Sequence, residues 1–284
     1  MRVRFGRTKE TVNAIGFGTW KLGGGWNSPD HSHDRASVDI IKLAISLGAD
    51  FVDTAEAYGG GHSEELVGRA LAELRKDDPS LEVFLATKVS PEHLHFEDVV
   101  RSCNASLRRL GIKQIDLYQV HWPNPRIPIS ETMSAFEELV SQGKVRYVGV
   151  SNFPVPLLEE AQSSMSKQEI QSDQVRYNLL ERSPEEDGVL DFCRKNSLTL
   201  VAYSPLARGE LGSSHALTLV DRIAQAHGAT RAQVFLAWLL SKGSVLPIPK
   251  ASRAEHLTEN IGAADIALEP KEIAQLDRLQ PESS

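Results

Sequence analysis

The chain alternates two kinds of segment along nearly its whole length. Short runs rich in β-branched and aromatic residues are followed by longer segments in which apolar positions recur at helical spacing. The first kind predicts buried strands and the second predicts amphipathic helices. Eight strand-like runs are found, at Ile15–Thr19, Phe51–Asp53, Val83–Thr87, Ile115–Val120, Val145–Val150, Glu169–Val175, Leu198–Tyr203 and Val245–Ile248.

Each strand-like run leads into at least one predicted helix. In the first helix, Val38, Ile41 and Leu47 fall near helical spacing, and Gly48 ends the pattern. We expect Ser63 to open the second helix, because its hydroxyl can accept a hydrogen bond from the first turn. The predicted helices span Arg35–Leu47, Ser63–Leu74, Glu97–Leu110, Ser130–Ser141, Pro154–Ser163, Pro184–Lys195, Ala216–Ala226, Thr230–Leu240, Arg253–Ala263 and Pro270–Leu279.

This regular alternation favours an α/β fold in which parallel strands are joined by helical crossovers. Eight such units predict a (β/α)₈ TIM barrel forming a single domain over residues 1–284, with an N-terminal hairpin at Val3–Val12 and additional C-terminal helices. A doubly wound open sheet is the alternative. It usually carries a G-x-G-x-x-G motif after its first strand, and Gly16, Gly18 and Gly23–Gly25 do not have that spacing.

Composition narrows the class of partner. The 284 residues are 41% hydrophobic and carry a net charge of −7, so we expect no nucleic-acid or membrane partner, since both need basic patches. No apolar run approaches the ~20 residues of a membrane-spanning helix. The N-terminal segment has no apolar signal core, and Cys103 and Cys193 are predicted to be free thiols. We therefore expect a cytoplasmic protein.

Four reactive side chains fall where three consecutive predicted strands end. Asp53 ends the second strand and Tyr58 follows in the loop, while Lys88 ends the third strand and His121 the fourth. Active sites of this barrel lie at the carboxyl ends of the strands, so these four residues, here called the strand-end cluster, should converge. Each residue alone could have an ordinary structural role, as a strand-end cap, a solvated charge at the rim of the barrel, or part of a loop or turn. Their occurrence together at the ends of consecutive strands favours an active site.

Carbonyl reduction suits this set of groups. Negative charge develops on the carbonyl oxygen, and a Tyr58 hydroxyl can protonate it, although an unperturbed phenol has a pKa of about 10. Lys88 is expected to lower that pKa if Asp53 keeps the ammonium charged, and His121 could hydrogen-bond the carbonyl oxygen.

No metal is needed for this chemistry. The exposed pairs His31/His33 and His93/His95 lack a carboxylate or cysteine cluster that would complete a site, so we predict that the protein has no metal site.

Several motifs resemble those of the aldo-keto reductase family, in the family's order and across nearly the whole chain. They lie at Phe51–Gly59, Leu85–Lys88, Leu107–Trp122, Gly143–Phe153, Gln174–Asn178, Ala202–Leu206 and Ile248–Asn260. The chain resembles a bacterial-type member with short substrate loops. The resemblance implies the catalytic roles given above for the strand-end cluster.

The resemblance also implies that the cofactor is NADPH or NADP, with NADH possible because His256 stands where many members have an adenine-stacking arginine. Ser151, Asn152 and Gln174 would bind the carboxamide, and Tyr203 would stack on the nicotinamide. The other implied cofactor contacts are Thr19, Trp20 and Asp53 near the nicotinamide end, Ser204, Leu206 and Gly209 at the pyrophosphate, Lys250, Ser252 and Arg253 at the 2′-phosphate, and His256, Glu259 and Asn260 at the adenine. A lysine and an arginine beside a helix N-terminus independently favour a phosphate pocket.

Three functions remain open from the sequence. The first is an NADPH-dependent reductase acting on a small-molecule carbonyl compound, expected to be monomeric. The second is a nucleotide-binding sensor or regulatory subunit resembling the potassium-channel β subunits of the family. The third is a (β/α)₈ hydrolase that uses Asp53 as a base without nicotinamide.

Overall fold

A computed structural model describes residues 1–209 and 215–279. Its main sheet contains eight parallel strands, and each strand is hydrogen-bonded to the next along the chain. Sequence order and spatial order are therefore the same, as a barrel requires. The strands are β3 (Phe17–Gly18), β6 (Phe51–Asp53), β7 (Phe84–Val89), β8 (Ile115–Val120), β9 (Val145–Ser151), β10 (Ile170–Arg176), β11 (Thr199–Tyr203) and β12 (Val245–Pro247).

The first and last strands meet and close the sheet. The amide nitrogen of Gly16 donates to the carbonyl oxygen of Pro247 at 3.0 Å, and that of Gly18 donates to Pro249 at 3.2 Å. Glycine is required at position 18, because a Cβ atom there would lie 2.8 Å from the carbonyl oxygen of Ile248. The predicted TIM barrel is confirmed.

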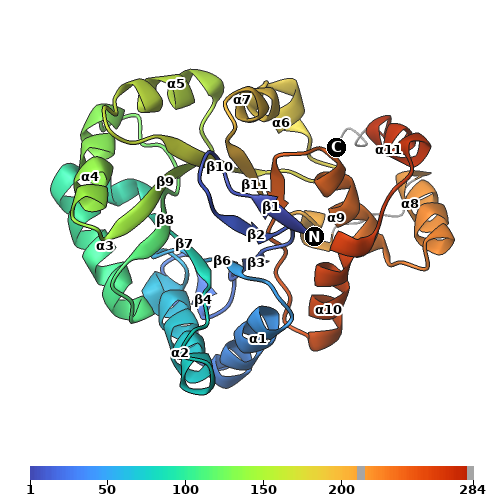
Figure 1. Ribbon diagram of the computed structural model, residues 1–284, viewed down its shortest axis with the longest axis horizontal. Coiled ribbons are helices and arrows are strands. Elements are labelled where there is room, and N and C mark those ends of the chain that lie inside the picture. The colour runs from blue at the N-terminus through green and yellow to red at the C-terminus, as the bar shows by residue number, and fades with distance from the viewer. Residues whose placement is uncertain (210–214, 280–284) are drawn as a thin grey trace.

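Helices surround the barrel as an outer ring (Figure 1). Their apolar faces pack on the outer side of the sheet, where two large apolar clusters form. The helices are α1 (Asp34–Ser46), α2 (His62–Asp77), α3 (Phe96–Leu110), α4 (Ile129–Ser141), α5 (Val155–Ser163), α6 (Ser183–Glu186), α7 (Val189–Lys195), α8 (His215–Ala226), α9 (Arg231–Ser241), α10 (Ala254–Gly262) and α11 (Pro270–Asp277), with short 3₁₀ turns η1 (Gly59–Gly61), η2 (Pro91–His93), η3 (Ala207–Gly209) and η4 (Ala263–Asp265).

The predicted N-terminal hairpin is also confirmed. Strands β1 (Arg2–Arg4) and β2 (Thr11–Asn13) pair antiparallel and cross the middle of the barrel in Figure 1. Between them Phe5 is fully buried, with its ring centroid 5.5 Å from Phe51 and 4.8 Å from Phe84, both of which belong to the inner core. The hairpin thus covers the amino-terminal end of the barrel.

Local differences from the sequence prediction have backbone causes. The single helix expected at Pro184–Lys195 is divided into α6 and α7, because Gly188 adopts a left-handed conformation with φ 82°. Helix α2 begins at His62 rather than at Ser63, whose hydroxyl instead donates to Thr19 inside the protein. A small hairpin, β4 (Gly24–Gly25) with β5 (Ser28–Pro29), was not predicted. Among the described residues, no helix has the length and apolarity to cross a bilayer.

Candidate active site

A buried ion pair forms the centre of the strand-end cluster. Lys88 on β7 has no exposed surface, and its Nζ donates to Asp53 Oδ1 at 2.5 Å and to the carbonyl oxygen of Thr54 at 2.9 Å. Burial lowers the pKa of Lys88, and the charge of Asp53 opposes that effect. The pair is possible here because adjacent parallel strands bring their carboxyl ends to one edge.

The phenol of Tyr58 lies beside this ammonium. Lys88 Nζ is 3.4 Å from Tyr58 Oη, and the phenol ring is nearly buried. Burial, together with the charge of Asp53, raises the pKa of Tyr58 well above 10. The lowering expected from the sequence is therefore wrong in direction, because burial disfavours the charged phenolate and the nearby carboxylate of Asp53 repels it. At neutral pH, Tyr58 keeps its proton.

His121 faces the same phenol. The two ring centroids are 5.4 Å apart in an edge-to-face arrangement, and burial lowers the pKa of His121 to about 2. The imidazole is therefore neutral over the working pH range and can donate a hydrogen bond from only one of its nitrogens. Its buried Nδ1 atom has no hydrogen-bond partner among the described residues. Trp26, from the β4–β5 hairpin, packs against the imidazole at 4.8 Å.

Asp53 accepts a second set of hydrogen bonds that was not expected from the sequence. Its Oδ2 atom accepts from Gln174 Nε2 at 2.9 Å and from Gln119 Nε2 at 3.3 Å. Gln174 was expected only as a cofactor contact, and Gln119 was not selected. Strand alternation could have identified Gln119, since it follows Ile115 and Leu117 on one face and is a polar residue at an inward position. The two amides hold one oxygen of the carboxylate, and Lys88 holds the other.

The residues expected at the nicotinamide end gather beside this network. Ser151 donates to the carbonyl oxygen of Gln174 at 2.7 Å, and the Asn152 side chain donates to Ser151 at 2.8 Å. The Tyr203 hydroxyl donates to Asn152 Oδ1 at 3.2 Å. Asn152 has φ 63°, a strained conformation that is common at functional sites.

Thr19 and Trp20 lie on the other side of the cluster. The Thr19 amide donates to the carbonyl oxygen of Asp53 at 2.9 Å. The indole ring of Trp20 packs edge-on against Tyr58 at 4.8 Å. Both residues directly follow β3 and lie against the strand-end cluster.

Two further groups extend outward from the cluster along β11 and β12. Ser204 follows Tyr203 with φ 49°, Leu206 is half-buried, and Gly209 is exposed with φ 79°. Lys250, Ser252 and Arg253 form an exposed basic segment in front of α10, and Arg253 contacts His256 one turn later. Glu259 is half-buried and Asn260 is buried on the same helix.

One expectation about metal ligands does not hold in three dimensions. From the sequence, no carboxylate or cysteine cluster was expected to complete a site with His31 and His33, but the structure brings Asp34 and His62 beside His31, with ligand atoms within 4.8 Å of one another. His62 is distant in sequence and arrives because the first turns of α1 and α2 are adjacent. His33, the expected companion, is not in this group.

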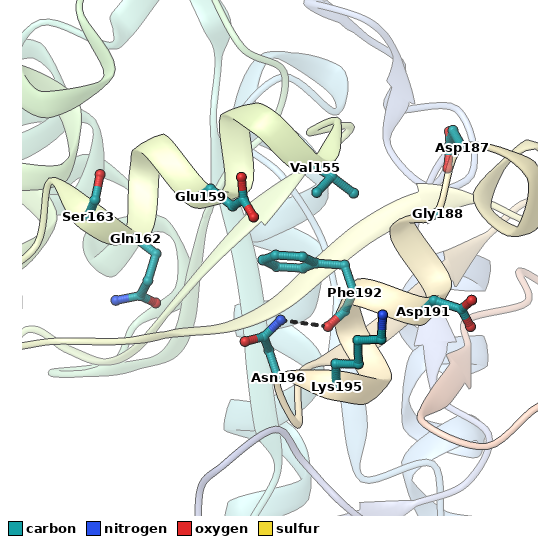
Figure 2. A pocket seen from close by; sticks show the side chains of 10 residues that line it. All are labelled: Val155, Glu159, Gln162, Ser163, Asp187, Gly188, Asp191, Phe192, Lys195 and Asn196. Carbon is teal, nitrogen blue, oxygen red and sulfur yellow. Dashed lines mark hydrogen bonds between the residues drawn. The ribbon is translucent and has the colours of Figure 1, made fainter.

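A separate groove lies on the outer surface, away from the strand-end cluster. It has a volume of about 780 Å³ and runs between α5 and the α6–α7 segment, with Phe192 in its wall (Figure 2). Asn196 donates to the carbonyl oxygen of Phe192 at 2.9 Å. None of the predicted catalytic or cofactor-binding residues lines this groove.

Comparisons with known proteins agree on one family. The sequence profile described as "Aldo/keto reductase family" matches residues 14–281. Methylglyoxal reductase YeaE of Escherichia coli (strain K12) is 36% identical over 273 residues, which cover 95% of this chain and 92% of the relative.

Solved structures give the same result. The thermostable aldo-keto reductase Tm1743 superposes with a TM-score of 0.92 at 49% identity, covering 98% of each chain. An aldo-keto reductase from Klebsiella pneumoniae in complex with NADPH has a TM-score of 0.87 at 38% identity, covering 99% of this chain and 95% of the other.

Proposed function

The chain belongs to the aldo/keto reductase family, and from that membership and the geometry of the strand-end cluster we propose that it reduces aldehydes and ketones to alcohols with NADPH. The observation that carries the proposal is the position of Lys88 Nζ, which lies 2.5 Å from Asp53 Oδ1 and 3.4 Å from Tyr58 Oη. A buried ammonium held between a carboxylate and a phenol suits proton donation to a developing oxyanion.

The residues present fit a phosphorylated dinucleotide. Partial burial lowers the pKa of Lys250, and the charge of Lys21 lowers it further. Two neighbouring cations therefore lie where an anion would relieve their repulsion. The amino terminus of α10, which has no side-chain cap, adds backbone donors nearby. We propose that Lys250, Ser252 and Arg253 hold the 2′-phosphate and that His256, Glu259 and Asn260 border the adenine.

The remaining contacts are proposed for the other half of the cofactor. Ser204, Leu206 and Gly209 would lie along the pyrophosphate, and Tyr203 would stack on the nicotinamide. The carboxamide would meet Ser151, Asn152 and Gln174, with Thr19, Trp20 and Asp53 nearby. The chemistry that NADPH supplies when bound is a hydride for the carbonyl carbon.

Within the cluster, Tyr58 acts as the general acid. It transfers the proton on Oη to the substrate oxygen as negative charge develops there. Lys88 then stabilises the phenolate left behind, and Asp53 keeps the ammonium charged and in place. Neutral His121 donates a hydrogen bond to the same substrate oxygen and orients the carbonyl group.

Small aldehydes are the substrate class to test first. YeaE and the DkgB proteins of two Salmonella strains are named methylglyoxal reductases, and DkgB of Salmonella typhi is 32% identical to this chain over 274 residues. In this chain the large exposed side chains near the cluster include Trp26 and Trp122. We propose that they line the approach of an uncharged carbonyl substrate.

The decisive experiment compares wild type with Tyr58→Phe. Purified wild type should consume NADPH with methylglyoxal or a simple aromatic aldehyde, followed by the loss of NADPH absorbance. The variant should bind NADPH with nearly unchanged affinity but turn over roughly 10²-fold more slowly, the scale of a lost general acid.

Two outcomes would contradict the proposal. Unchanged turnover in the phenylalanine variant would exclude Tyr58 as the proton donor. NADPH binding without turnover across a broad aldehyde and ketone panel would exclude the reductase and favour the sensor interpretation.

A further inference from the structure

Three side chains of the kinds that bind metals meet on the outer side of the barrel mouth. Asp34 is the first residue of α1 and His62 is the first residue of α2, while His31 lies in the loop before α1. Their ligand atoms lie within 4.8 Å of one another. None of the three belongs to the strand-end cluster or to the proposed cofactor contacts.

His62 is held in one orientation. Its side chain is 6% exposed, its Nδ1 is 3.0 Å from Glu65 Oε2, and its Nε2 is 2.7 Å from Asp34 Oδ1. Each ring nitrogen therefore faces a carboxylate oxygen, so a proton on Nε2 is the competitor that a metal ion would displace from the space beside Asp34. A carboxylate on the far nitrogen is also the usual partner of a metal-bound histidine.

The spacing suits a small transition-metal ion. Nitrogen and oxygen ligands lie about 2.0–2.2 Å from zinc, so neighbouring ligand atoms are roughly 3.3 Å apart. Two observed separations are near that value: His62 Nε2 lies 2.7 Å from Asp34 Oδ1, and His31 Nδ1 lies 3.8 Å from the other carboxylate oxygen, Asp34 Oδ2. The side chain of His31 is 66% exposed, so a small rotation can bring it into place.

Arg69 is the competing charge at this position. Its Nη1 lies 3.1 Å from Asp34 Oδ2, and its side chain is half exposed. A carboxylate has two oxygens with about four acceptor positions, so Arg69 and a metal ion can share Asp34. The positive charge of Arg69 should nevertheless weaken metal binding. Removing that charge should therefore strengthen binding, whereas removing a ligand should weaken it.

We propose that His31, Asp34 and His62 bind one divalent transition-metal ion of the zinc, cobalt and nickel class, with water completing the coordination. Two imidazoles and one carboxylate form a ligand set that these ions accept. The site would join the first turns of α1 and α2. It would also restrain the segment after Tyr58, because the amides of Gly61 and Ser63 both donate to the Tyr58 carbonyl oxygen at 3.2 Å.

The test measures binding directly, on untagged full-length protein freed of metal with a chelator. Titration with CoCl₂ should give saturable visible absorption bands of a low-coordinate site, and ZnCl₂ should displace the cobalt and bind with one-to-one stoichiometry by calorimetry. His31→Ala and His62→Ala should each weaken Zn²⁺ binding tenfold or more, and Arg69→Gln should strengthen it.

His95→Ala is the matched control. His95 is another exposed histidine beside a carboxylate, with its Nδ1 3.0 Å from Glu131 Oε1, but it lies outside the group. Its loss should leave Zn²⁺ affinity unchanged. Because His62 is buried and its removal can unfold the protein, the exposed His31→Ala variant decides the matter. Absence of saturable binding in wild type, or equal loss in His31→Ala and His95→Ala, would overturn the proposal.

Discussion

At the scale of single residues, burial and the charge of Asp53 determine the behaviour of Tyr58. An unpaired ammonium 3.4 Å from the phenol would favour its ionisation, but Lys88 is paired with Asp53, whose Oδ1 lies 2.5 Å from the same Nζ. Burial disfavours the charged phenolate and the carboxylate charge repels it, so the pKa of Tyr58 is raised. A residue proposed to donate a proton is therefore kept in its acid form.

A first prediction concerns Lys250. Lys250→Ala should weaken NADPH binding roughly tenfold or more, because a charge-assisted hydrogen bond to phosphate is lost. NADH, which lacks the 2′-phosphate, should lose little affinity. Fluorescence titration with both nucleotides measures the difference, and equal loss for the two would show that Lys250 does not contact that phosphate.

A second prediction concerns Asp173 on β10. It is fully buried, and burial raises its pKa well above 3.8 against the opposing effect of the Phe153 backbone amide. Above that pH the unfolded chain loses a proton that the folded protein retains, so this group lowers stability as pH rises. Each unit by which the pKa of Asp173 in the folded protein exceeds that in the unfolded chain corresponds to about 1.4 kcal/mol of unfolding free energy.

Asp173→Asn removes this titration. The unfolding free energy of the variant, measured by denaturant titration, should increase relative to wild type between about pH 4 and pH 8. A difference that stays constant over this range would mean that Asp173 does not carry the pH dependence.

At the scale of elements, a buried ionic contact joins α2, α3 and β7. Glu64 in the first turn of α2 is fully buried, where it accepts from Arg109 Nε of α3 at 2.6 Å and from Thr87 Oγ1 of β7 at 2.5 Å. Burial raises the pKa of Glu64, and Arg109 opposes that effect. Since Thr87 precedes Lys88, this contact also fixes the strand that presents the ammonium.

A third prediction tests that contact. Arg109→Met should lower the unfolding free energy by roughly 3–5 kcal/mol, because it leaves the Glu64 carboxylate buried without a counter-ion. Adding Glu64→Gln should recover much of that loss, since no charge then remains unpaired. Denaturant unfolding of both variants measures the two effects. Equal destabilisation by the single and double changes would show that packing, rather than the ionic contact, is responsible.

Element boundaries show what a linear pattern can and cannot predict. Hydrophobic periodicity identified all eight strands and placed α3 within one residue of its observed range, Phe96–Leu110. It did not predict the break at Gly188, because a left-handed glycine inside an amphipathic pattern leaves the periodicity intact. Nor did it show that Glu64 is buried, since its partner Arg109 comes from another helix.

At the scale of the whole molecule, the hairpin β1–β2 acts as the floor of the barrel. Phe5 packs with Phe51 and Phe84. The two residues that follow it bind the barrel wall, since Gly6 N donates to Thr199 Oγ1 at 2.8 Å and Arg7 N donates to Gln171 Oε1 at 2.9 Å. The floor therefore belongs to the inner core.

A fourth prediction follows for Phe5. Phe5→Ala should reduce the unfolding free energy by about 3–5 kcal/mol, because a large buried ring is lost from a core that cannot fully collapse. Turnover of the folded variant at low temperature should be nearly normal, since the strand-end cluster lies at the other end of the barrel. Thermal unfolding and steady-state kinetics check the two parts. A loss of stability below about 1 kcal/mol would mean that the hairpin only lies against the barrel.

The barrel and the strand-end cluster could be predicted together, because both follow from where the parallel strands begin and end in the sequence. Asp53, Lys88 and His121 end consecutive strands, and parallel strands bring such residues to one mouth. What the sequence could not show was electrostatic detail. The raised pKa of Tyr58 depends on how completely the phenol is buried and on how close Asp53 lies to it, and the approach of His62 to His31 depends on how two helices pack.

The seam between β3 and β12 affects how the protein is made. Gly16 pairs with Pro247, so the wall of the barrel cannot be completed until β12 has been synthesised and has left the ribosome. Until then the nascent chain has an unprotected sheet edge. Ribosome-bound chains stalled before Val245 should therefore be cut readily by protease, whereas chains stalled well beyond Pro249 should resist.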